Sequence, residues 1–545
     1  MSVPAPSDGN DDPWWYDRIA HQAHALAASG FTHLQLPPVH STIGKDSPTS
    51  DGYGVYWEYD LGSDNRPTRF GTAERLQRMC AIAKANGLSL LADWVPHQRY
   101  GGRGGFYDYK SSSGAPGRFP KTPSCFLRTG GNPGGVPRDP IAGPVADDFA
   151  FGDELCPINA LPKGYVLNGL IDAGDWLYRR LNLDGCRNDD TKGQAFEAVM
   201  KWANAKAMKG KTVIGEYAEG DRNTLRWWVE QTGLRCSTYD FEVKYRARDM
   251  CNNGSRWNMQ QLTRAGLASF GWPYSMNAVT FIENADSDTN GFGSVVFNKL
   301  LGYAWILTSE GWPSIYYRDY ATDKYCYGLK PHIDNLIWIH EHLANGPTVW
   351  RHAEYQFVVY ERPGEPGLLV GLNNDVWGGW KNCWVPTSFP PGTRLHDYTG
   401  HSDDVTVGPT GWVQIWIPPN NNGKGYVCLS KAGYSKPNEV KKWATTQVFE
   451  GADDLDIAPA MPGRTLPVQR IWCAKESQVR MERKAGLDTL QFMLVDQGGA
   501  TIGNDGADWL RTHDEGWYTI LVTNNGMNAA PFQIAVTYTA PQEMR

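Results

Sequence analysis

Four carboxylates stand where short apolar runs of this sequence end: Asp93, Asp189, Glu216 and Asp286. Paired carboxylates suit the cleavage of a glycosidic bond, because one attacks the anomeric carbon while a second, with a raised pKa, protonates the leaving oxygen. A third carboxylate can stabilise the positive charge that develops on the sugar. If the four runs are strands that end on one rim, these residues predict glycosidic-bond chemistry there.

An arginine accompanies one of these acids. Because side chains alternate along a strand, Arg187 and Asp189 are expected on the same face. A neighbouring arginine lowers the pKa of a carboxyl and keeps it ionised for nucleophilic attack. A single acid at a strand end is usually a turn residue or a helix cap. Several acids on one rim raise one another's pKa and therefore indicate a functional site.

The acids need a scaffold that gathers strand ends. From Trp14 to Tyr320, apolar runs alternate with helix-like stretches such as Thr72–Asn86, closed by Gly87, and Val166–Leu181. The runs are Thr32–Leu36, Leu88–Val95, Leu183–Asp189, Thr212–Tyr217, Thr238–Val243, Ala278–Asn284 and Ser314–Tyr317. This alternation predicts an α/β fold, best matched by a (β/α)8 TIM barrel, whose catalytic groups lie at the C-terminal ends of the strands. A doubly wound sheet is the alternative, but no glycine-rich phosphate loop follows the first run.

The remaining sequence predicts an insertion and two further β domains. The stretch between Val95 and Leu183 is rich in Gly, Pro and Ser, and so long a loop is usually functional. After Gly346, short alternating runs separated by turn residues are typical of antiparallel sheets. We expect barrel parts at 1–98 and 163–346, a loop-rich domain B at 99–162, an all-β domain C at 347–432 and an accessory β-sandwich at 442–545.

Composition excludes several classes of protein. The 545 residues are 41% hydrophobic and 20% charged, with a formal net charge of −7. No apolar stretch approaches the roughly 18 residues of a membrane span, and a phosphate-binding protein would show a basic surplus, so we expect neither a membrane nor a nucleic-acid partner. The 23 Trp and 26 Tyr favour a protein that handles flat apolar faces such as sugar rings, although most of them are expected in cores.

The start of the chain and its cysteines bear on location. Residues Met1–Pro13 have neither a basic start nor an apolar run, so they lack the features of a secretory signal. Disulfides between cysteines in neighbouring loop-rich segments would favour an extracellular or periplasmic location. We expect such a location, and we expect the protein to be a monomer. The candidate pairs are Cys125 with Cys156, Cys236 with Cys251, and Cys383 with Cys428.

The acid-bearing segments, in this order, resemble the four signature regions of the α-amylase family, glycoside hydrolase family 13. Further matches are Ser50–Tyr56 before Tyr59–Gly62, Thr308–Pro313 before the last run, and a domain C-like stretch after Leu329–Pro331. The resemblance spans about residues 14 to 430. It implies a retaining α-glucan hydrolase that acts on starch-like polysaccharides or oligosaccharides. The four segments are Ala92–Gln98, Gly185–Asp190, Ile214–Tyr217 and Phe281–Asp286.

Position by position, the resemblance assigns a role to three of the acids. Asp189 would be the nucleophile, Glu216 the general acid/base and Asp286 the third carboxylate. Retention of configuration predicts that the carboxyl groups of Asp189 and Glu216 lie roughly 5–5.5 Å apart. The substrate-binding residues would be Tyr53 under the sugar that is cleaved, Arg187, His97, Gln98, and Lys192 on the acceptor side.

Three signature regions depart from the family pattern. His97-Gln98 stands where the family has Asn-His, Lys192-Gly193 where it has Lys-His, and Ala285 in place of the histidine before Asp286. The Asp-Trp-Val-Pro-x-Gln segment is similar to that of the glucansucrases. The acids therefore predict intact bond-breaking machinery with altered sugar contacts.

Calcium is a candidate cofactor through the same resemblance, and no other cofactor is expected. The family's structural ion is ligated partly by the asparagine that His97 replaces, and imidazole is a poor ligand for calcium. The carbonyl of Gly193 and the acids Asp147, Asp148 and Asp153 are alternative oxygen ligands.

Two other functions compete with hydrolysis. The glucansucrase-like segment suggests an α-transglucosylase. A non-catalytic glucan-binding protein is the rival of another class, and the three retained acids count against it. Trp227, Trp228, Trp377, Trp380 and Trp384 are candidate sugar platforms, although packing in a core or seam is the expected role. Trp509 and Trp517 make the last β domain either a carbohydrate-binding module or a plain sandwich.

Overall fold

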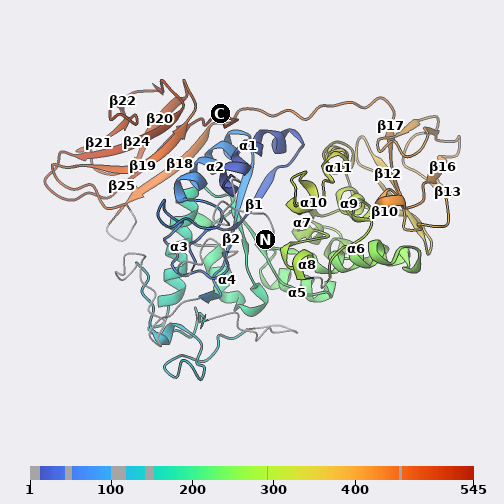
Figure 1. Ribbon diagram of the computed structural model, residues 1–545, viewed down its shortest axis with the longest axis horizontal. Helices are drawn as coiled ribbons and strands as arrows, with labels where there is room; N and C mark the ends of the chain where they lie inside the picture. Colours follow the sequence, from blue (N-terminus) through green and yellow to red (C-terminus); the bar gives the residue numbers. More distant parts are fainter. Residues whose placement is uncertain are drawn as a thin grey trace. The chain divides into compact units, whose positions relative to one another are not determined.

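The computed structural model describes residues 13–42, 52–99, 118–141, 153–290, 293–452 and 457–544. These residues form two compact units. The terminal unit contains the described residues up to 213 and those from 439 onward, and the central unit contains residues 214–438. Figure 1 colours the chain along its sequence, so the terminal unit is blue to cyan and red, and the central unit green to orange.

The terminal unit contains three parallel strands, each preceded or followed by a helix. Strand β1 pairs with β2, and β2 pairs with β5, with Asp93 of β2 in register with Arg187 of β5. Strand β2 is buried from its second residue on, as is typical of a strand covered on both faces. The strands are β1 (His33–Pro38), β2 (Ser89–Trp94) and β5 (Gly185–Asn188), and the helices α1 (Trp15–Ala28), α2 (Ala73–Ala85), α3 (Tyr165–Leu181) and α4 (Phe196–Ala203).

Local signals explain where helix α2 starts and stops. The Thr72 hydroxyl accepts a hydrogen bond from the Arg75 N–H and caps the helix. Leu76, Met79 and Ile82 lie on its buried side. The chain leaves the helix through Gly87, whose φ of +80° favours glycine. The predicted helix is thus confirmed to within two residues.

Buried charges fix the segment that follows β2. Strand β3 (Gln98–Arg99) pairs with β4 (Asp153–Glu154). Glu58 is fully buried and accepts hydrogen bonds from Arg99 Nε at 2.8 Å and Lys121 Nζ at 2.9 Å. Two cations around one carboxylate offset the cost of burying it, and they hold the described part of the insertion on the strands.

Two four-stranded antiparallel sheets complete the terminal unit. Their order is β18-β25-β20-β23 and β19-β24-β21-β22, and their shared core includes Phe492, Ile520 and Val536 together with Ala81 and Ala85 of α2. The strands are β18 (Thr445–Gly451), β19 (Thr465–Cys473), β20 (Gln478–Ala485), β21 (Leu490–Val495), β22 (Thr501–Asn504), β23 (Leu510–Arg511), β24 (Gly516–Asn524) and β25 (Phe532–Tyr538). This sandwich therefore packs on the helical face of the same unit (Figure 1).

The central unit continues the parallel pattern. Strand β6 pairs with β7, β7 with β8, and β8 with β9. The strands are β6 (Thr212–Gly215), β7 (Ser237–Tyr239), β8 (Ala278–Thr280) and β9 (Trp312–Pro313). The helices are α5 (Arg222–Gln231), α6 (Phe241–Asn253), α7 (Tyr274–Asn277), α8 (Ala285–Asn290), α9 (Lys299–Thr308), α10 (Tyr317–Tyr320) and α11 (Lys330–Leu343).

Two predicted strands differ from those observed. The run Thr238–Val243 is a strand only as far as Tyr239, because the Asp240 carboxylate accepts a hydrogen bond from the Val243 N–H and starts helix α6. The run Ser314–Tyr317 is not a strand, and the parallel pairing falls on Trp312–Pro313 instead.

Antiparallel strands follow α11. A six-stranded sheet has the order β10-β11-β12-β17-β14-β15, and β13 pairs only with β16 in a separate two-stranded sheet. The two sheets share a core that contains Val359, Leu369, Val385, Ile415 and Val427. The strands are β10 (Val349–Ala353), β11 (Phe357–Arg362), β12 (Leu368–Asn373), β13 (Lys381–Pro386), β14 (Arg394–Asp397), β15 (Val405–Thr406), β16 (Trp412–Ile417) and β17 (Tyr426–Lys431).

Several expectations about single residues are corrected. The three proposed pairs, Cys125 with Cys156, Cys236 with Cys251 and Cys383 with Cys428, are not disulfides. Trp377, Trp380 and Trp384 are 90%, 50% and 59% exposed, so packing in a core is wrong for them, whereas Trp228 is buried as expected. Within the described part of the chain, no helix is both long and apolar enough to cross a bilayer.

Candidate active site

Arg187 joins two carboxylates at the ends of β2 and β5. Its Nη1 lies 2.8 Å and 3.0 Å from the two carboxylate oxygens of Asp93, and 2.5 Å from Oδ1 of Asp189. All three side chains are nearly buried. Burial and the nearby Asp189 raise the pKa of Asp93, although Arg187 opposes the shift. The guanidinium thus places a positive charge beside both carboxylates.

Tyr53 and Gln98 complete this cluster. The Tyr53 hydroxyl donates to Asp93 Oδ2 at 2.8 Å, and the Arg187 guanidinium lies 5.6 Å from the centre of its ring. The Gln98 amide donates to Asp189 Oδ2 at 3.3 Å and to the Tyr53 carbonyl at 3.4 Å. Four predicted site residues therefore meet here, with Asp93 as a fifth member to which the sequence alone assigned no role.

A tight turn follows Asp189. Asp190 has a φ of +43°, in the left-handed region that aspartate tolerates better than most residues. The Gln194 amide donates to the Asp189 carbonyl at 2.6 Å and to the Asn188 side chain at 3.3 Å. Lys192 lies half-buried in the short 3-10 helix Thr191–Gly193. The turn thereby fixes the end of β5.

His97 lies between two carboxylates. Its Nδ1 is 3.2 Å from Asp190 Oδ2 and its Nε2 is 3.6 Å from Glu154 Oε1, and Arg138 also pairs with Glu154 at 2.9 Å. Burial lowers the pKa of His97, but Glu154 and Asp190 outweigh it and the pKa is raised. The ring is 3% exposed, so it is an ion-pairing group inside the unit.

This arrangement does not fit a calcium ion at the His97 position. Calcium needs several oxygen ligands, and the two carboxylates here already face the imidazole and a guanidinium. A side chain at Gly193 would come within 3.1 Å of the His97 ring, so the space beside that residue is already filled. Of the other predicted ligands, Asp153 lies in β4, and Asp147 and Asp148 lie outside the described residues.

The other two acids belong to the central unit. Glu216 directly follows β6 and is half-buried, and the next residue, Tyr217, packs against Trp228 with ring centres 5.7 Å apart. Asp286 lies in the first turn of α8 and is exposed. Glu216 therefore stands directly after a parallel strand, and Asp286 lies in the segment that follows β8, which ends at Thr280, as expected for a barrel.

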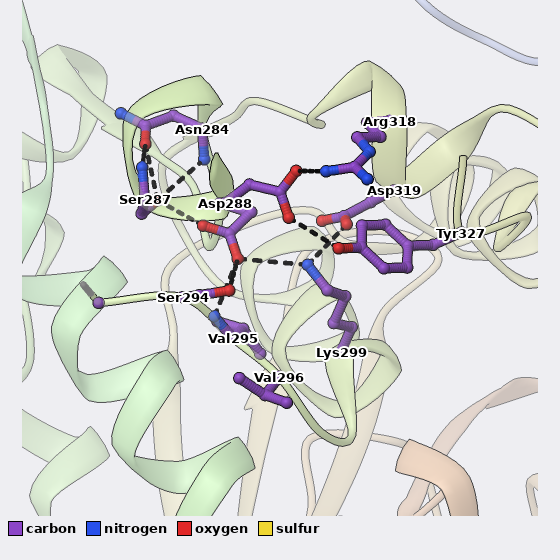
Figure 2. Close-up of polar contacts among 12 residues, drawn as sticks. Asn284, Ser287, Asp288, Ser294, Val295, Val296, Lys299, Arg318, Asp319 and Tyr327 are labelled. Atoms are coloured by element: carbon purple, nitrogen blue, oxygen red, sulfur yellow. Dashed lines mark hydrogen bonds and ion pairs between the residues drawn. The ribbon is translucent and has the colours of Figure 1, made fainter. Parts of the chain in front are cut away.

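A buried network holds the segment that carries Asp286. The Glu283 carboxylate accepts hydrogen bonds from Val295 N–H at 2.8 Å, Ser294 Oγ at 3.2 Å and Lys299 Nζ at 3.2 Å, and it also binds the Ser287 hydroxyl. The Asn284 side chain accepts from Ser287 N–H at 3.0 Å and caps α8. Figure 2 shows the contact between Asn284 and Ser287, together with Ser294, Val295 and Lys299.

A second set of contacts secures the other end of α8. Asp288 pairs with Arg318 and accepts from the Tyr327 hydroxyl at 2.8 Å (Figure 2). Its side chain is 1% exposed. Of the acids at positions 283, 286 and 288, only Asp286 is solvent-exposed. No sequence signal beyond the acids themselves indicated this network, because its partners lie in later segments.

Known proteins resemble this chain in sequence and in fold. A family model described as Alpha-amylase C-terminal matches residues 368–435. An α-amylase of Geobacillus stearothermophilus is 28% identical over 75% of this chain and 85% of its own length, and one of Bacillus licheniformis is 25% identical over 75% and 89%. A glucan 1,4-alpha-maltotetraohydrolase of Stutzerimonas stutzeri is 26% identical over 77% and 72%.

Solved structures show the same fold. An α-amylase from Geobacillus thermoleovorans in complex with acarbose matches with a TM-score of 0.56 at 14% identity, and covers 80% of this chain and 96% of its own. An Anoxybacillus α-amylase matches with a TM-score of 0.57 at 17% identity, over 76% and 90%. The predicted α/β barrel with C-terminal antiparallel sheets is thereby confirmed against the doubly wound alternative. Over about three quarters of its length the chain resembles α-amylases, which supports an α-amylase-type glycoside hydrolase.

Proposed function

We propose that this enzyme cleaves α-glucosidic bonds in starch-like polysaccharides or oligosaccharides with retention of configuration. The observation that carries the proposal is the contact of Arg187 with both Asp93 and Asp189. A buried carboxylate with a guanidinium partner stays ionised and can attack carbon, which an uncompensated buried acid would not do.

In the first step Asp189 is the nucleophile. Its Oδ attacks the anomeric carbon while the carboxylic acid of Glu216 gives its proton to the departing glycosidic oxygen, so the shortened glucan leaves as an alcohol. Asp286 stabilises the positive charge on the sugar in the transition state. The product of this step is a glycosyl ester on Asp189.

In the second step water releases the sugar. Glu216, now a carboxylate, takes a proton from water as the oxygen attacks the anomeric carbon. The ester bond to Asp189 breaks, and both acids return to their starting protonation states. Two inversions give net retention.

The residues around Asp189 define the proposed sugar contacts. Tyr53 offers a ring beside the nucleophile, and its hydroxyl is anchored on Asp93. Gln98 occupies the position of a family histidine, and its amide donates to Asp189 instead. Lys192 is proposed to face the acceptor side from the turn after β5.

Transfer to a sugar acceptor is the second candidate. The contact of Gln98 with Asp189 favours transfer. Gln98 is the residue that makes the first signature region similar to that of the glucansucrases, and its amide donates a hydrogen bond to the proposed nucleophile. Cyclomaltodextrin glucanotransferases are also among the relatives, at 22% identity over 76% of this chain for the Thermoanaerobacterium thermosulfurigenes enzyme.

A product profile tests both candidates. The enzyme is incubated with starch, pullulan, dextran and sucrose, with and without a labelled maltose acceptor, and the anomer formed first is followed by NMR. Shorter products of α configuration support hydrolysis with retention. Labelled products longer than maltose indicate transfer, and β products would contradict the role of Asp189 as nucleophile.

We further propose that the protein is extracellular or periplasmic and acts as a monomer. A polysaccharide too large to cross a membrane has to be cut where it is met. Cell fractionation tests the location, and light scattering tests the oligomeric state.

A further inference from the structure

Exposed tryptophans cover the outer face of the two-stranded sheet β13–β16. Trp384 on β13 is 59% exposed, and Trp412 and Trp416 on β16 are each 44% exposed. The other face of the same strands is buried in the core through Val385 and Ile415. The two strands lie side by side in Figure 1. Singly scattered indoles are ordinary on a surface, but a group on one sheet face indicates a binding site.

The strand register sets the indoles among amides. Trp384 is directly opposite Gln414, and Trp416 is directly opposite Asn382. The Gln414 Nε2 donates to Asn382 Oδ1 at 3.1 Å. Trp380, 50% exposed, continues the alternation of β13 one residue before the strand begins. Trp384 and Trp416 thus each have a directly opposite amide side chain that can bond a hydroxyl group.

The charge and shape of this indole face limit its occupant. Its outward side chains carry no charge: Asn382, Trp384 and Pro386 on β13, and Trp412, Gln414 and Trp416 on β16. An uncharged, hydroxyl-rich ligand complements such a surface, because flat indoles cover apolar C–H faces while the amides bond hydroxyls. A charged polymer would find no partner among these six residues.

The size of the face also argues against a second copy of the chain. Trp412 and Trp416 are four residues apart on one strand, or about 13 Å at about 3.3 Å per residue. Two strands of that length present an area on the order of 200 Å², whereas a stable protein interface takes about 800 Å² from each partner. A narrow linear ligand fits these dimensions.

We propose that the indole face binds a linear, neutral α-glucan chain as a surface site separate from the catalytic acids. The sugar class rests on the proposed function, whereas the site itself rests on the indole and amide geometry. Glu216 and Asp286 follow strands of the parallel sheet, and the indole face lies on the antiparallel sheet that follows α11. Its role is to hold a polymer while the catalytic residues act on it.

The test uses the full-length protein in native gels that contain soluble starch. The double variant Trp384→Ala/Trp416→Ala is compared with wild type, with Trp509→Ala as the matched control, because Trp509 is also 50% exposed but lies in the C-terminal sandwich. We expect the double variant to bind starch about tenfold more weakly, equivalent to about 1.4 kcal/mol. Trp509→Ala should bind as wild type does. Because the replaced side chains are exposed, the melting temperature and turnover of maltotetraose should not change.

Each other outcome overturns the proposal. If the double variant binds starch as strongly as wild type, these indoles do not form a starch site. If Trp509→Ala weakens starch binding instead, the site lies in the C-terminal sandwich. Retention by a β-glucan but not by starch contradicts the sugar class. A wild-type dimer that the double variant converts to monomer shows a self-interface. Failure of the proposed function gives a different result, namely no hydrolysis of maltotetraose while starch binding still depends on Trp384 and Trp416.

Discussion

Arg187 and Asp189 are joined by a 2.5 Å contact between Nη1 and Oδ1, and the same nitrogen lies 2.8 Å from Asp93. One buried guanidinium therefore serves two carboxylates from neighbouring strands. Because Asp93 also accepts a hydrogen bond from Tyr53, the side chains of Arg187, Asp189, Asp93 and Tyr53 form one connected cluster. Loss of any member is expected to disturb the charge or the position of Asp189.

Replacing Asp189 with Asn should remove the covalent step. An amide oxygen is a poor nucleophile, so kcat should fall by about 10⁴-fold or more. A fluorosugar that traps the glycosyl-enzyme should label the wild-type peptide at Asp189, as mass spectrometry would show. Asp190→Asn is the control, which should still be labelled at Asp189. A label on Asp190 would contradict the assignment.

Glu216→Gln should abolish turnover while leaving sugar binding in place. The amide is nearly isosteric but cannot donate the proton that the leaving oxygen needs, so the rate should fall by about 10²–10⁴-fold. Glu219→Gln, three residues further along the same loop, is the matched control and should retain its rate. A Glu216→Gln enzyme that keeps more than a tenth of the wild-type rate would show that another group supplies the proton.

Ala285→His should raise turnover on maltooligosaccharides. Ala285 opens helix α8 beside the exposed Asp286, and alanine offers no donor to the sugar hydroxyls. A hydrogen bond that strengthens with charge on the sugar lowers the barrier, and a tenfold gain corresponds to about 1.4 kcal/mol. Ala285→Leu, which adds bulk without a donor, should not gain. A decrease in kcat for Ala285→His would show that a small side chain is needed there.

A chelator should shift the melting temperature only slightly. The carboxylates beside His97 face an imidazole and a guanidinium rather than a metal, and ligand stabilisation depends on ligand concentration relative to Kd. Differential scanning calorimetry with EDTA, and with calcium restored, measures this. A large drop that calcium reverses would show that other residues hold an ion.

The ion pairs of His97 should also make its contribution to stability depend on pH. Its pKa is raised in the folded state, so the stabilisation is fully present below the unfolded value of 6.5 and is lost as pH rises through the folded value. The destabilisation caused by His97→Gln should therefore be larger at about pH 6 than at about pH 9. Urea unfolding of both proteins at the two pH values checks the sign, and an effect independent of pH would contradict it.

Lys299→Met should strongly destabilise the fold. Its Nζ lies 2.6 Å from Asp319 and 3.2 Å from Glu283, and neither carboxylate side chain is exposed. Burial already raises the pKa of Asp319 to about 6 despite the lysine. Removing the cation from a buried pair typically costs about 3–5 kcal/mol.

Lys201→Met is the control for this loss. Its ion pair with Glu197 is more than half exposed on both sides, and such a pair contributes about 1 kcal/mol or less. The free energy of unfolding of both variants decides the comparison. Equal effects would show that the buried network adds nothing beyond a surface pair.

The sequence by itself determined the features that depend on neighbouring residues. Thr72 and Gly87 mark the ends of α2 because a cap and a left-handed glycine act within one turn. The position of Asp189 two residues after Arg187 predicts a shared face because side chains alternate along a strand. The acids that follow several parallel strands predict the class of chemistry, because the C-terminal ends of such strands meet on one rim. The family was indicated by the resemblance of the four segments that carry these acids.

Only the tertiary structure decided which partners those residues meet. From the sequence, His97 in place of the family asparagine suggests that calcium binding is lost. The ion pair of His97 with Glu154 could not be predicted, because Glu154 lies on a strand far along the chain. Trp384 and Trp416 alternate with apolar residues in sequence, and which face is exposed depends on how β13 and β16 cover their shared core. Contacts of this kind come from long-range packing, in which the burial of one face leaves the other to solvent, and no local pattern specifies them.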